Sequence, residues 1–419
     1  MKKVSKFLFA LTFTLNFFFF ANLVFAGEVD VLINKLVEKG ILTKTEAQQV
    51  ATEAKEEARK EAIKGSYAAL PSWVQNLKLK GDLRLRYQWE DKSSATGSSP
   101  DRHRGRYRFR LGLESEVNDQ LIVAAGLATG SSDPRSTNQT MTDTFGTPDI
   151  RLDYAYAEWS ANPWMTLRGG KVKSIKKEIF RPSDLLWDSD IHPEGLTIAL
   201  DKKVNDTNLF ANNAFWVLGE SSSDTSDPVM WVVQPGFKTK LSDDVKLTAA
   251  VAGYFFDNVK GATLNHSAES NTLENGVLKY NYNSVSPSIQ LDIKEPFNIA
   301  VLDKMSLFGD FVYNPDPSDK NQGWLAGVKF KMAGPLKIFG KKWDLKYMYR
   351  HLEKDAWLDT FPDSDAQGGA TDVKGHEVAI SYPLGKNTSL GLDYYLVQNI
   401  DATDPKRRHV LQVDWEMKF

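Results

Sequence analysis

The chain has 419 residues, of which 25% are charged and 11% aromatic, and its formal net charge is −2. This length is enough for about two or three ordinary domains or for one large β architecture. The charge content excludes a helical membrane bundle, the absence of cysteine excludes disulfides and thiol chemistry, and the acidic balance argues against general nucleic-acid binding.

Residues 1–26 have the pattern of a secretory signal peptide. Three lysines precede an apolar run over residues 7–20, and Val24-Phe25-Ala26 is a plausible small-residue cleavage site. An uncleaved membrane anchor is the alternative, but Asn16 and Asn22 interrupt the apolar run. Cleavage after Ala26 would remove three lysines and no acids, which changes the formal net charge from −2 to −5.

Residues 27–65 are predicted to form a periplasmic helical arm. Apolar residues recur at helical spacing from Val29 onward, Gly40 is a natural stop, and Thr43 with Glu46 has the spacing of a capping box. The charged second helix is either a small coiled coil that binds a subunit or a periplasmic partner, or a solvated helix without one. Residues 66–76, around Pro71, are predicted to be a linker.

From residue 77 to residue 419 the pattern changes to segments with a period of two, separated by clusters of Gly, Asn, Asp, Pro and Ser. Counting these segments gives sixteen strands joined alternately by eight long loops and seven short turns. Long loops at one end and short turns at the other are typical of an outer-membrane barrel. We therefore predict an all-β transmembrane barrel of about 16 antiparallel strands, preceded by the short α-helical arm.

The two faces of these segments agree with a barrel. In LKLKGDLRLRYQWE (77–90) leucines and aromatics alternate with charged residues, and RGRYRFRLGL (104–113) alternates arginines with Tyr107, Phe109 and Leu111. A soluble protein would expose the charged face and a nucleic-acid binder would aim it at phosphate, whereas a barrel turns it toward a water-filled lumen and its apolar face toward lipid. The amphipathic last segment ends at Phe419, which looks like the signal read by the outer-membrane assembly machinery.

Over residues 77–419 the chain resembles the putative porin family of Gram-negative outer membranes, which is similar in architecture to sixteen-stranded general porins. The resemblance rests on GDLRLRYQWE (81–90), RGRYRFRLGLE (104–114), LDYAYAEW (152–159) and DLLWDSDIHPEGL (184–196). The family tends to have asparagine where this chain has His192, so no role is assigned to that position. The resemblance implies a homotrimeric, water-filled diffusion channel whose third external loop folds inward. It does not imply an enzyme.

Candidate pore residues fall in two groups. Seven of the fifteen arginines lie between residues 84 and 110, and if the third loop folds inward its acids would face this basic wall, setting up a transverse field that favours polar solutes. In the alternative interpretation, the arginines only pair with lumenal acids such as Asp82, Glu90, Glu114 and Asp153. The predicted wall comprises Arg84, Arg86, Arg106, Arg108, Arg110, Arg151 and Arg168, and the predicted constriction-loop acids are Asp184, Asp188, Asp190 and Glu194.

No cofactor or metal site is predicted. The six histidines lack metal-ligand spacing, and there is no G-x-S-x-G or phosphate-loop motif. Asp188, Asp190 and Glu194, or Asp316 and Asp319, have the hard oxygen ligands calcium prefers, but neither run has the spacing of a calcium loop. The predicted function is passive diffusion of small hydrophilic solutes; the alternatives are an adhesion or envelope-tethering barrel and a barrel hydrolase.

Overall fold

The structure is a computed structural model that describes residues 72–94, 97–223, 226–333, 342–403, 405 and 407–419, together with isolated stretches between residues 33 and 57. The chain separates into two compact units, residues 1–76 and residues 77–419. The predicted signal peptide lies outside the described residues, as does most of the predicted linker. Within the described residues, no helix is long and apolar enough to cross a membrane.

The described parts of the first unit are helical. Residues 45–50 form helix, and the capping box is present: Thr43 donates from its backbone N and its hydroxyl to Glu46 Oε2 at 2.8 and 2.7 Å, while Glu46 N donates to Thr43 Oγ1 at 3.3 Å. A short helix α4 (Ser72–Gln75) lies in the predicted linker. Whether the arm has a partner stays a prediction.

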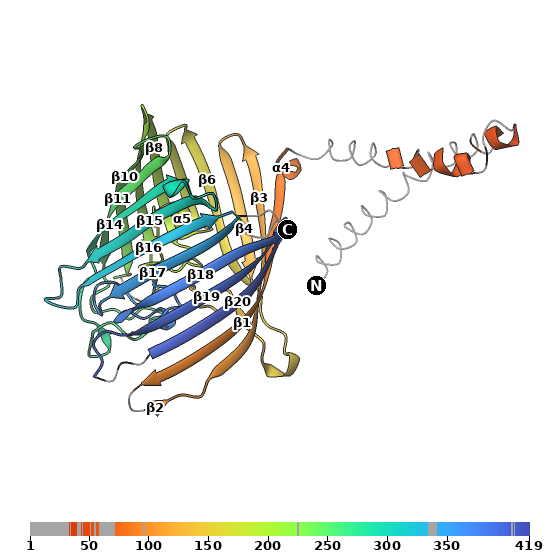
Figure 1. Cartoon of the computed structure of the whole chain (residues 1–419). Coiled ribbons are helices and arrows are strands. Elements are labelled where there is room, and N and C mark those ends of the chain that lie inside the picture. Colours follow the sequence, from red (N-terminus) through yellow and green to blue (C-terminus); the bar gives the residue numbers. More distant parts are fainter. Residues whose placement is uncertain are drawn as a thin grey trace. The chain divides into compact units, whose positions relative to one another are not determined.

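The second unit is a closed antiparallel barrel (Figure 1). Each long strand pairs with its sequence neighbours, and β1 pairs with β20 to close the sheet, leaving no free edge. Sixteen long strands are found in the described residues: β1 (Leu77–Ser94), β3 (Arg102–Asn118), β4 (Leu121–Ala128), β6 (Arg151–Asn162), β7 (Met165–Lys171), β8 (Glu194–Val204), β9 (Thr207–Val217), β10 (Val229–Lys240), β11 (Val245–Asp257), β14 (Ser284–Lys294), β15 (Leu302–Tyr313), β16 (Gln322–Met332), β17 (Trp343–Leu352), β18 (Val373–Gly385), β19 (Thr388–Asn399) and β20 (Arg407–Lys418).

Short elements occupy the connections. They are the two-residue strands β2 (Gly97–Ser98), β5 (Gln139–Thr140), β12 (Leu273–Glu274) and β13 (Val277–Leu278), the helix α5 (Ile175–Glu178), and the 3₁₀ turns η1 (Asp143–Phe145), η2 (Pro296–Asn298) and η3 (Gln367–Gly369). Most connections alternate between short and long along the chain. The rim with the shorter connections, here called the short-turn end, carries the start of β1 and the end of β20. The other rim is called the long-loop end. The predicted strand number is confirmed, and the alternation of loops holds except at the connections between β14 and β15 (residues 295–301) and between β16 and β17 (residues 333–342).

The two faces of the strands differ as the sequence pattern predicts. On β1, Leu85 and Tyr87 are 38% and 46% exposed on the outer surface, whereas Arg86 and Gln88, which alternate with them, are 5% and 1% exposed. The same alternation holds on β10, where Trp231 is exposed and Met230 and Val232 are buried. Because successive side chains of a strand point to opposite faces, one set enters the lumen, charged or polar on β1 and apolar on β10, and the other set forms the apolar outer band.

Two glycines define the point at which the third long loop (residues 172–193) leaves the wall. Gly170 near the end of β7 and Gly195 near the start of β8 are register partners, with φ of +115° and +147°. A Cβ would lie 2.4 Å from the Ala155 carbonyl oxygen at the first position and 2.1 Å from that of Phe215 at the second. Only glycine combines this backbone with such close approach.

Candidate functional site

Five of the predicted wall arginines lie on one hairpin. In the register of β1 and β3, Arg84 is directly opposite Arg108, and Arg86 is directly opposite Arg106, while Arg110 follows toward the short-turn end. Like charges directly opposite one another destabilise a sheet. The wall therefore requires compensating groups nearby.

The last strand supplies two of these groups. Arg86 donates from Nε and Nη2 to the two carboxylate oxygens of Asp414, both at 2.7 Å, and Arg108 Nη2 donates to Glu416 Oε1 at 2.7 Å. Asp414 and Glu416 lie on β20, in register with Arg86 and Arg84. Barrel closure thus brings acids from the end of the chain to arginines near its start, and the sequence reasoning missed both acids.

Acids within the first hairpin complete the pairing. Asp82 accepts from Arg108 Nε and Arg110 Nε, both at 2.8 Å, and Glu90 pairs with Arg104. These two acids were among the four predicted as lumenal partners of the arginines. The other two lie elsewhere: Glu114 is 3.9 Å from Lys78 Nζ, and Asp153 is 3.8 Å from His192 Nδ1.

Arg84 and Arg106 are compensated more weakly than their neighbours. Arg84 Nη2 donates to Asn138 Oδ1 at 2.6 Å, and its nearest ion-pair partner, Asp414, is 3.7 Å away. Arg106 donates to Gln88 Oε1 at 3.1 Å, and in the described part of the chain it forms no ion pair within 4.0 Å. Asn138 belongs to the second long loop (residues 129–150), so this loop also reaches the wall.

The remaining two arginines lie apart from this hairpin. Arg151, the first residue of β6, donates to the Gly130 carbonyl and pairs with Asp149 at 3.3 Å at the long-loop end. Arg168 on β7 pairs with Glu158 at 2.7 Å and with Glu178 of α5 at 3.6 Å. Their ion pairs are separate from those of Arg84 to Arg110.

The predicted loop acids go to different places. Asp190 lies 3.6 Å from Arg110 Nη1 and accepts from Thr137 N at 3.4 Å. Asp188 accepts from the backbone N of Ser364 at 2.8 Å. Burial, together with nearby carboxylates, raises the pKa of Asp188 well above its ordinary value. Glu194 is already on β8, where it is exposed and pairs with Lys171 at 2.6 Å.

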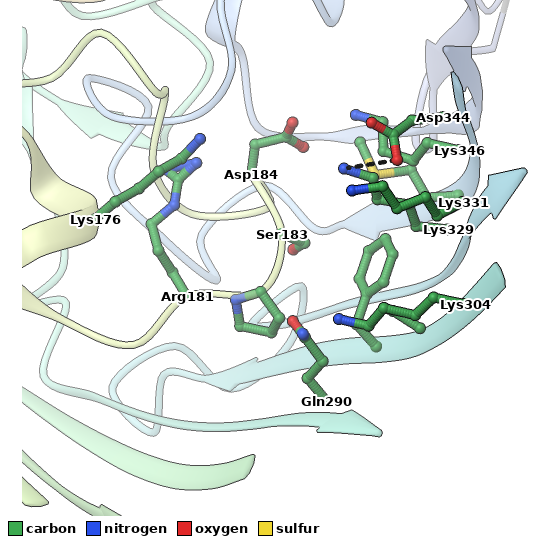
Figure 2. Close-up of a pocket in the computed structure, with 14 residues that line it drawn as sticks. Lys176, Arg181, Ser183, Asp184, Gln290, Lys304, Lys329, Lys331, Asp344 and Lys346 are labelled. Atoms are coloured by element: carbon green, nitrogen blue, oxygen red, sulfur yellow. Dashed lines mark ion pairs between the residues drawn. The ribbon is translucent and has the colours of Figure 1, made fainter. Parts of the chain in front are cut away.

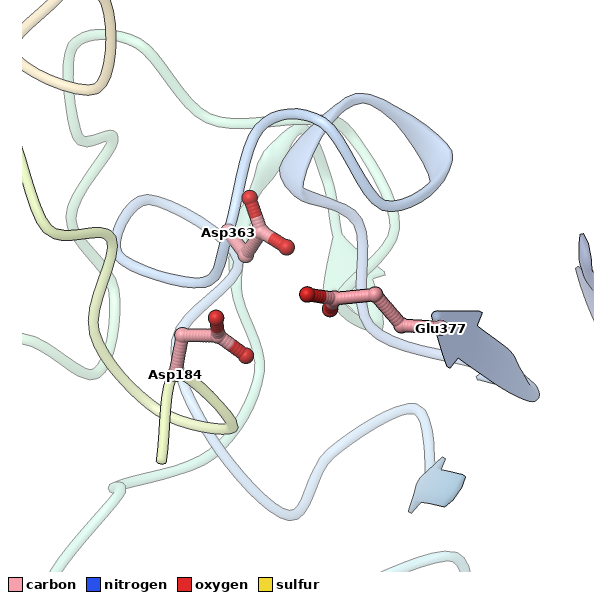
Figure 3. Close-up of side chains that lie close together, drawn as sticks. All are labelled: Asp184, Asp363 and Glu377. Atoms are coloured by element: carbon pink, nitrogen blue, oxygen red, sulfur yellow. The ribbon is translucent and has the colours of Figure 1, made fainter. Parts of the chain in front are cut away.

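Asp184 joins a buried cluster with Asp363 and Glu377 (Figure 3). Arg350 Nη2, on β17, donates to Asp184 at 2.9 Å, to Asp363 at 3.0 Å and to Glu377 of β18 at 2.9 Å. The three carboxylates are close enough together to surround a cation, and the guanidinium supplies that charge. Arg350 therefore fastens two loops to the wall, because Asp363 belongs to the seventh long loop (residues 353–372).

The seventh loop was not predicted to take part in the site. Its Asp365 pairs at 3.2 Å with Arg86 Nη1, the guanidinium nitrogen that does not donate to Asp414. Its Trp357 donates from Nε1 to the Leu186 carbonyl at 2.8 Å, and the Phe361 carbonyl accepts from Asp188 N at 2.7 Å. The loop sequence carries a signal that was overlooked: an apolar run, AWL at residues 356–358, in a connection that would otherwise face water.

Aromatic packing joins the third and seventh loops. The Trp187 ring lies 5.5 Å from the Trp357 ring and 4.8 Å from the Phe361 ring, centroid to centroid. Both loops also pack on inward residues of β9 to β11, including Trp216 and Tyr254. The part of the lumen beside β9 to β11 thus contains an apolar core.

Wall and loops meet at a cavity of about 250 Å³. Its lining contains equal numbers of cationic and carboxylate side chains. The cations are Arg84, Arg86, Arg108, Arg135, Lys176, Arg181 and Lys346, and the carboxylates are Asp184, Asp188, Asp190, Asp363, Asp365, Glu377 and Asp393. A strongly charged but balanced lining favours water and polar solutes over apolar ones.

A closed sixteen-stranded barrel with a charged, loop-narrowed lumen defines a transmembrane channel of the porin class. The chain belongs to the putative porin family, whose model matches residues 89–291 and 289–419. The resemblance stated from the sequence is confirmed, and the family and the fold indicate a non-enzymatic channel of the Gram-negative outer membrane.

The chain is similar to solved structures of porins. The structure of Pseudomonas putida OprB at high pH matches with a TM-score of 0.53 and 10% identity, over 83% of this chain and 95% of that chain. Two mutants of the Rhodopseudomonas blastica porin match with TM-scores of 0.44 and 12% identity, over 82% of this chain and 100% of theirs. The likeness to OprB concerns the fold alone. A comparison with curated proteins found no match.

The pH dependence of loop packing provides a test of the Arg350 cluster. The pKa of Asp363 is raised from 3.8 to about 7, mainly by burial and secondly by the neighbouring carboxylate of Asp184. Since the folded pKa is above the unfolded one, the packed seventh loop loses stability as pH rises between these two values and changes little above about 7. We expect the rate of proteolytic cleavage within residues 353–372 to increase over this range.

In the variant Asp363→Asn, the rate of proteolytic cleavage should depend much less on pH, because the amide does not ionise. Asp319→Asn, in the exposed sixth long loop (residues 314–321), is the matched control and should retain the wild-type profile. Equal pH dependence in wild type and Asp363→Asn would contradict the assignment.

Proposed function

We propose that the protein is a passive channel for small hydrophilic solutes and ions, with its selective region where the arginine wall of β1 and β3 meets the third and seventh loops. The observation that carries the proposal is the 250 Å³ cavity between the wall and the loops, which is lined by seven cationic and seven acidic side chains. The ordered loops narrow the lumen and the charges keep it hydrated.

The finer parts of the proposal follow the family resemblance. The short-turn end faces the periplasm, where the helical arm lies, and the long-loop end faces the outside, as in outer-membrane barrels. The protein assembles as a homotrimer, and the outer-membrane assembly machinery recognises the strand that ends at Phe419. Native mass determination in detergent tests the trimer.

Purified, folded protein in planar lipid bilayers tests channel activity directly. Stepwise conductance is expected, and its absence from a correctly folded, heat-modifiable barrel would exclude the proposal.

Selectivity tests the role of the wall. Arg84 lines the cavity and lies 3.7 Å from its nearest ion-pair partner, so Arg84→Ala removes a lumenal charge while disturbing few contacts. Acids then outnumber cations in the cavity, and we expect the reversal potential in a salt gradient to shift toward cation preference. Arg151→Ala, which removes the same charge at the long-loop end, should leave the reversal potential unchanged. Equal shifts in both variants would mean that the wall does not select.

A further inference from the structure

A second cavity lies between the third loop and the wall formed by β14 to β17, nearer the short-turn end (Figure 2). Its volume is about 490 Å³, which is within the usual range for a small-molecule site. Unlike the balanced 250 Å³ cavity, its lining has six cations and two carboxylates. The cations are Lys176, Arg181, Lys304, Lys329, Lys331 and Lys346, and the carboxylates are Asp184 and Asp344. We call this cavity the lysine vestibule.

The two acids of the vestibule do not neutralise its cations. Asp184 accepts from Arg350 at 2.9 Å, so part of its charge is compensated outside the cavity. Asp344 is 3.8 Å from Lys329 Nζ, an exposed pair that contributes little. Outside the cavity, Lys304 pairs with Asp292 at 3.0 Å and Lys346 pairs with Glu377.

Of the other three cations, two lie within electrostatic reach of Asp184, but none forms a close ion pair among the described residues. Within the described residues, Lys176, Arg181 and Lys331 form no ion pair within 4.0 Å. Arg181 donates from Nη1 to the carbonyl oxygens of Trp187 and Asp188, but its Nε is buried without a hydrogen-bond partner in the part of the chain described. Burial, and next the adjacent Arg181, lower the pKa of Lys176, so an anion beside these two side chains would relieve their repulsion.

The cations approach the cavity from two sides. In Figure 2, Lys176 and Arg181 lie on the third loop at one side, and the lysines of β15, β16 and β17 lie across the cavity at the other. Because Lys329 and Lys331 are two residues apart on β16, both side chains point into the lumen. A ligand held between the two sides would need negative charge at both of its ends.

We propose that the lysine vestibule is a binding subsite for small multivalent anions, such as diphosphates or tricarboxylates, that pass through the channel. The proposal rests on the proposed function and names a solute class for it. Ammonium and guanidinium groups pair with phosphate and carboxylate oxygens through charge-assisted hydrogen bonds, and the excess of cations raises the local anion concentration beside the narrow region. Lys176, Arg181, Asp184 and Lys346 line both cavities, so the subsite adjoins the narrow region.

The test measures block of the chloride current in planar bilayers by pyrophosphate and, separately, by citrate. Both anions are expected to block the wild-type channel at lower concentration when added at the short-turn side. In Lys329→Gln/Lys331→Gln the half-blocking concentration should rise at least about tenfold, the ratio equivalent to ~1.4 kcal/mol. Block by pyrophosphate but not citrate would restrict the solute class to phosphates, and the reverse would restrict it to carboxylates.

The control removes two lysines of the barrel that do not line the vestibule. Lys203 near the end of β8 and Lys240 at the end of β10 are exposed at the short-turn end, so Lys203→Gln/Lys240→Gln has the same net charge as the test variant. The anions should block the control variant at the same half-blocking concentration as wild type. Equal shifts in both double variants would mean general charge attraction and would overturn the subsite, as would an unchanged half-blocking concentration in the test variant.

A binding measurement separates failure of the subsite from failure of the channel. Calorimetric titration of pyrophosphate into the folded, detergent-solubilised protein should show binding that weakens in Lys331→Gln, a single change at an unpaired lysine. Binding without any conductance would exclude the proposed function and leave the subsite in place. Conductance without saturable binding or block would overturn the subsite alone.

Discussion

Replacing Arg350 by methionine is expected to lower the free energy of unfolding by about 3–5 kcal/mol, the usual cost of removing one partner from a buried ion pair. Arg350 is 3% exposed and its Nη2 donates to three carboxylates. Methionine fills similar space but leaves these carboxylates facing one another in a buried site. Denaturant-induced unfolding in detergent micelles measures the loss.

Two further variants isolate the charge effect. Arg407→Met, at the exposed start of β20, removes the same charge where, among the residues that the structure describes, the side chain donates only to Gln398, and it should change stability by less than about 0.5 kcal/mol. Adding Asp363→Asn and Glu377→Gln to Arg350→Met should restore part of the lost stability, since the repulsion is removed. Failure of this rescue would show that Arg350 acts through packing alone.

Replacing Trp187 by alanine is expected to detach the third loop from the seventh. The Trp187 side chain is 2% exposed and packs against Trp216, Trp357 and Phe361, so truncation should cost about 3–5 kcal/mol of local packing. Because these loops narrow the lumen, we expect larger and noisier single-channel currents together with faster proteolysis within residues 172–193.

The matched control is Trp231→Ala. Trp231 is 48% exposed on the outer surface of β10 and donates from Nε1 to Asp257 at 3.1 Å. It makes no contact with the lumen, so its removal should leave single-channel conductance at the wild-type level. A normal current and normal protease resistance in Trp187→Ala would show that the loops are held by their polar contacts instead.

Most charged side chains of the arginine wall form ion pairs because of how the wall is built. The arginines of β1 and β3 stand opposite one another, and each such pair is stable only with acids beside it. Asp82 comes from the same hairpin, Asp414 from the far end of the chain and Asp365 from a loop. The lysines of the vestibule have fewer partners, so a net positive charge is concentrated there rather than at the wall.

The sequence alone was sufficient for the barrel. Strand period, the length of each connection and the choice of inward side chain are local properties, so the number of strands, their limits within a few residues and the charged lumen could be read from LKLKGDLRLRYQWE and its counterparts. The capping box at Thr43 is local in the same sense.

The partners of the charged residues required the tertiary structure. Asp414 meets Arg86 because β20 closes on β1, Asp184 meets Arg350 because the third loop crosses the lumen, and Asp365 reaches the wall because the seventh loop folds inward beside it. These contacts join residues 166 to 328 positions apart, and no periodic pattern encodes such pairs. Their geometry depends on barrel closure and on the aromatic packing of two loops, which act only once the whole chain has folded.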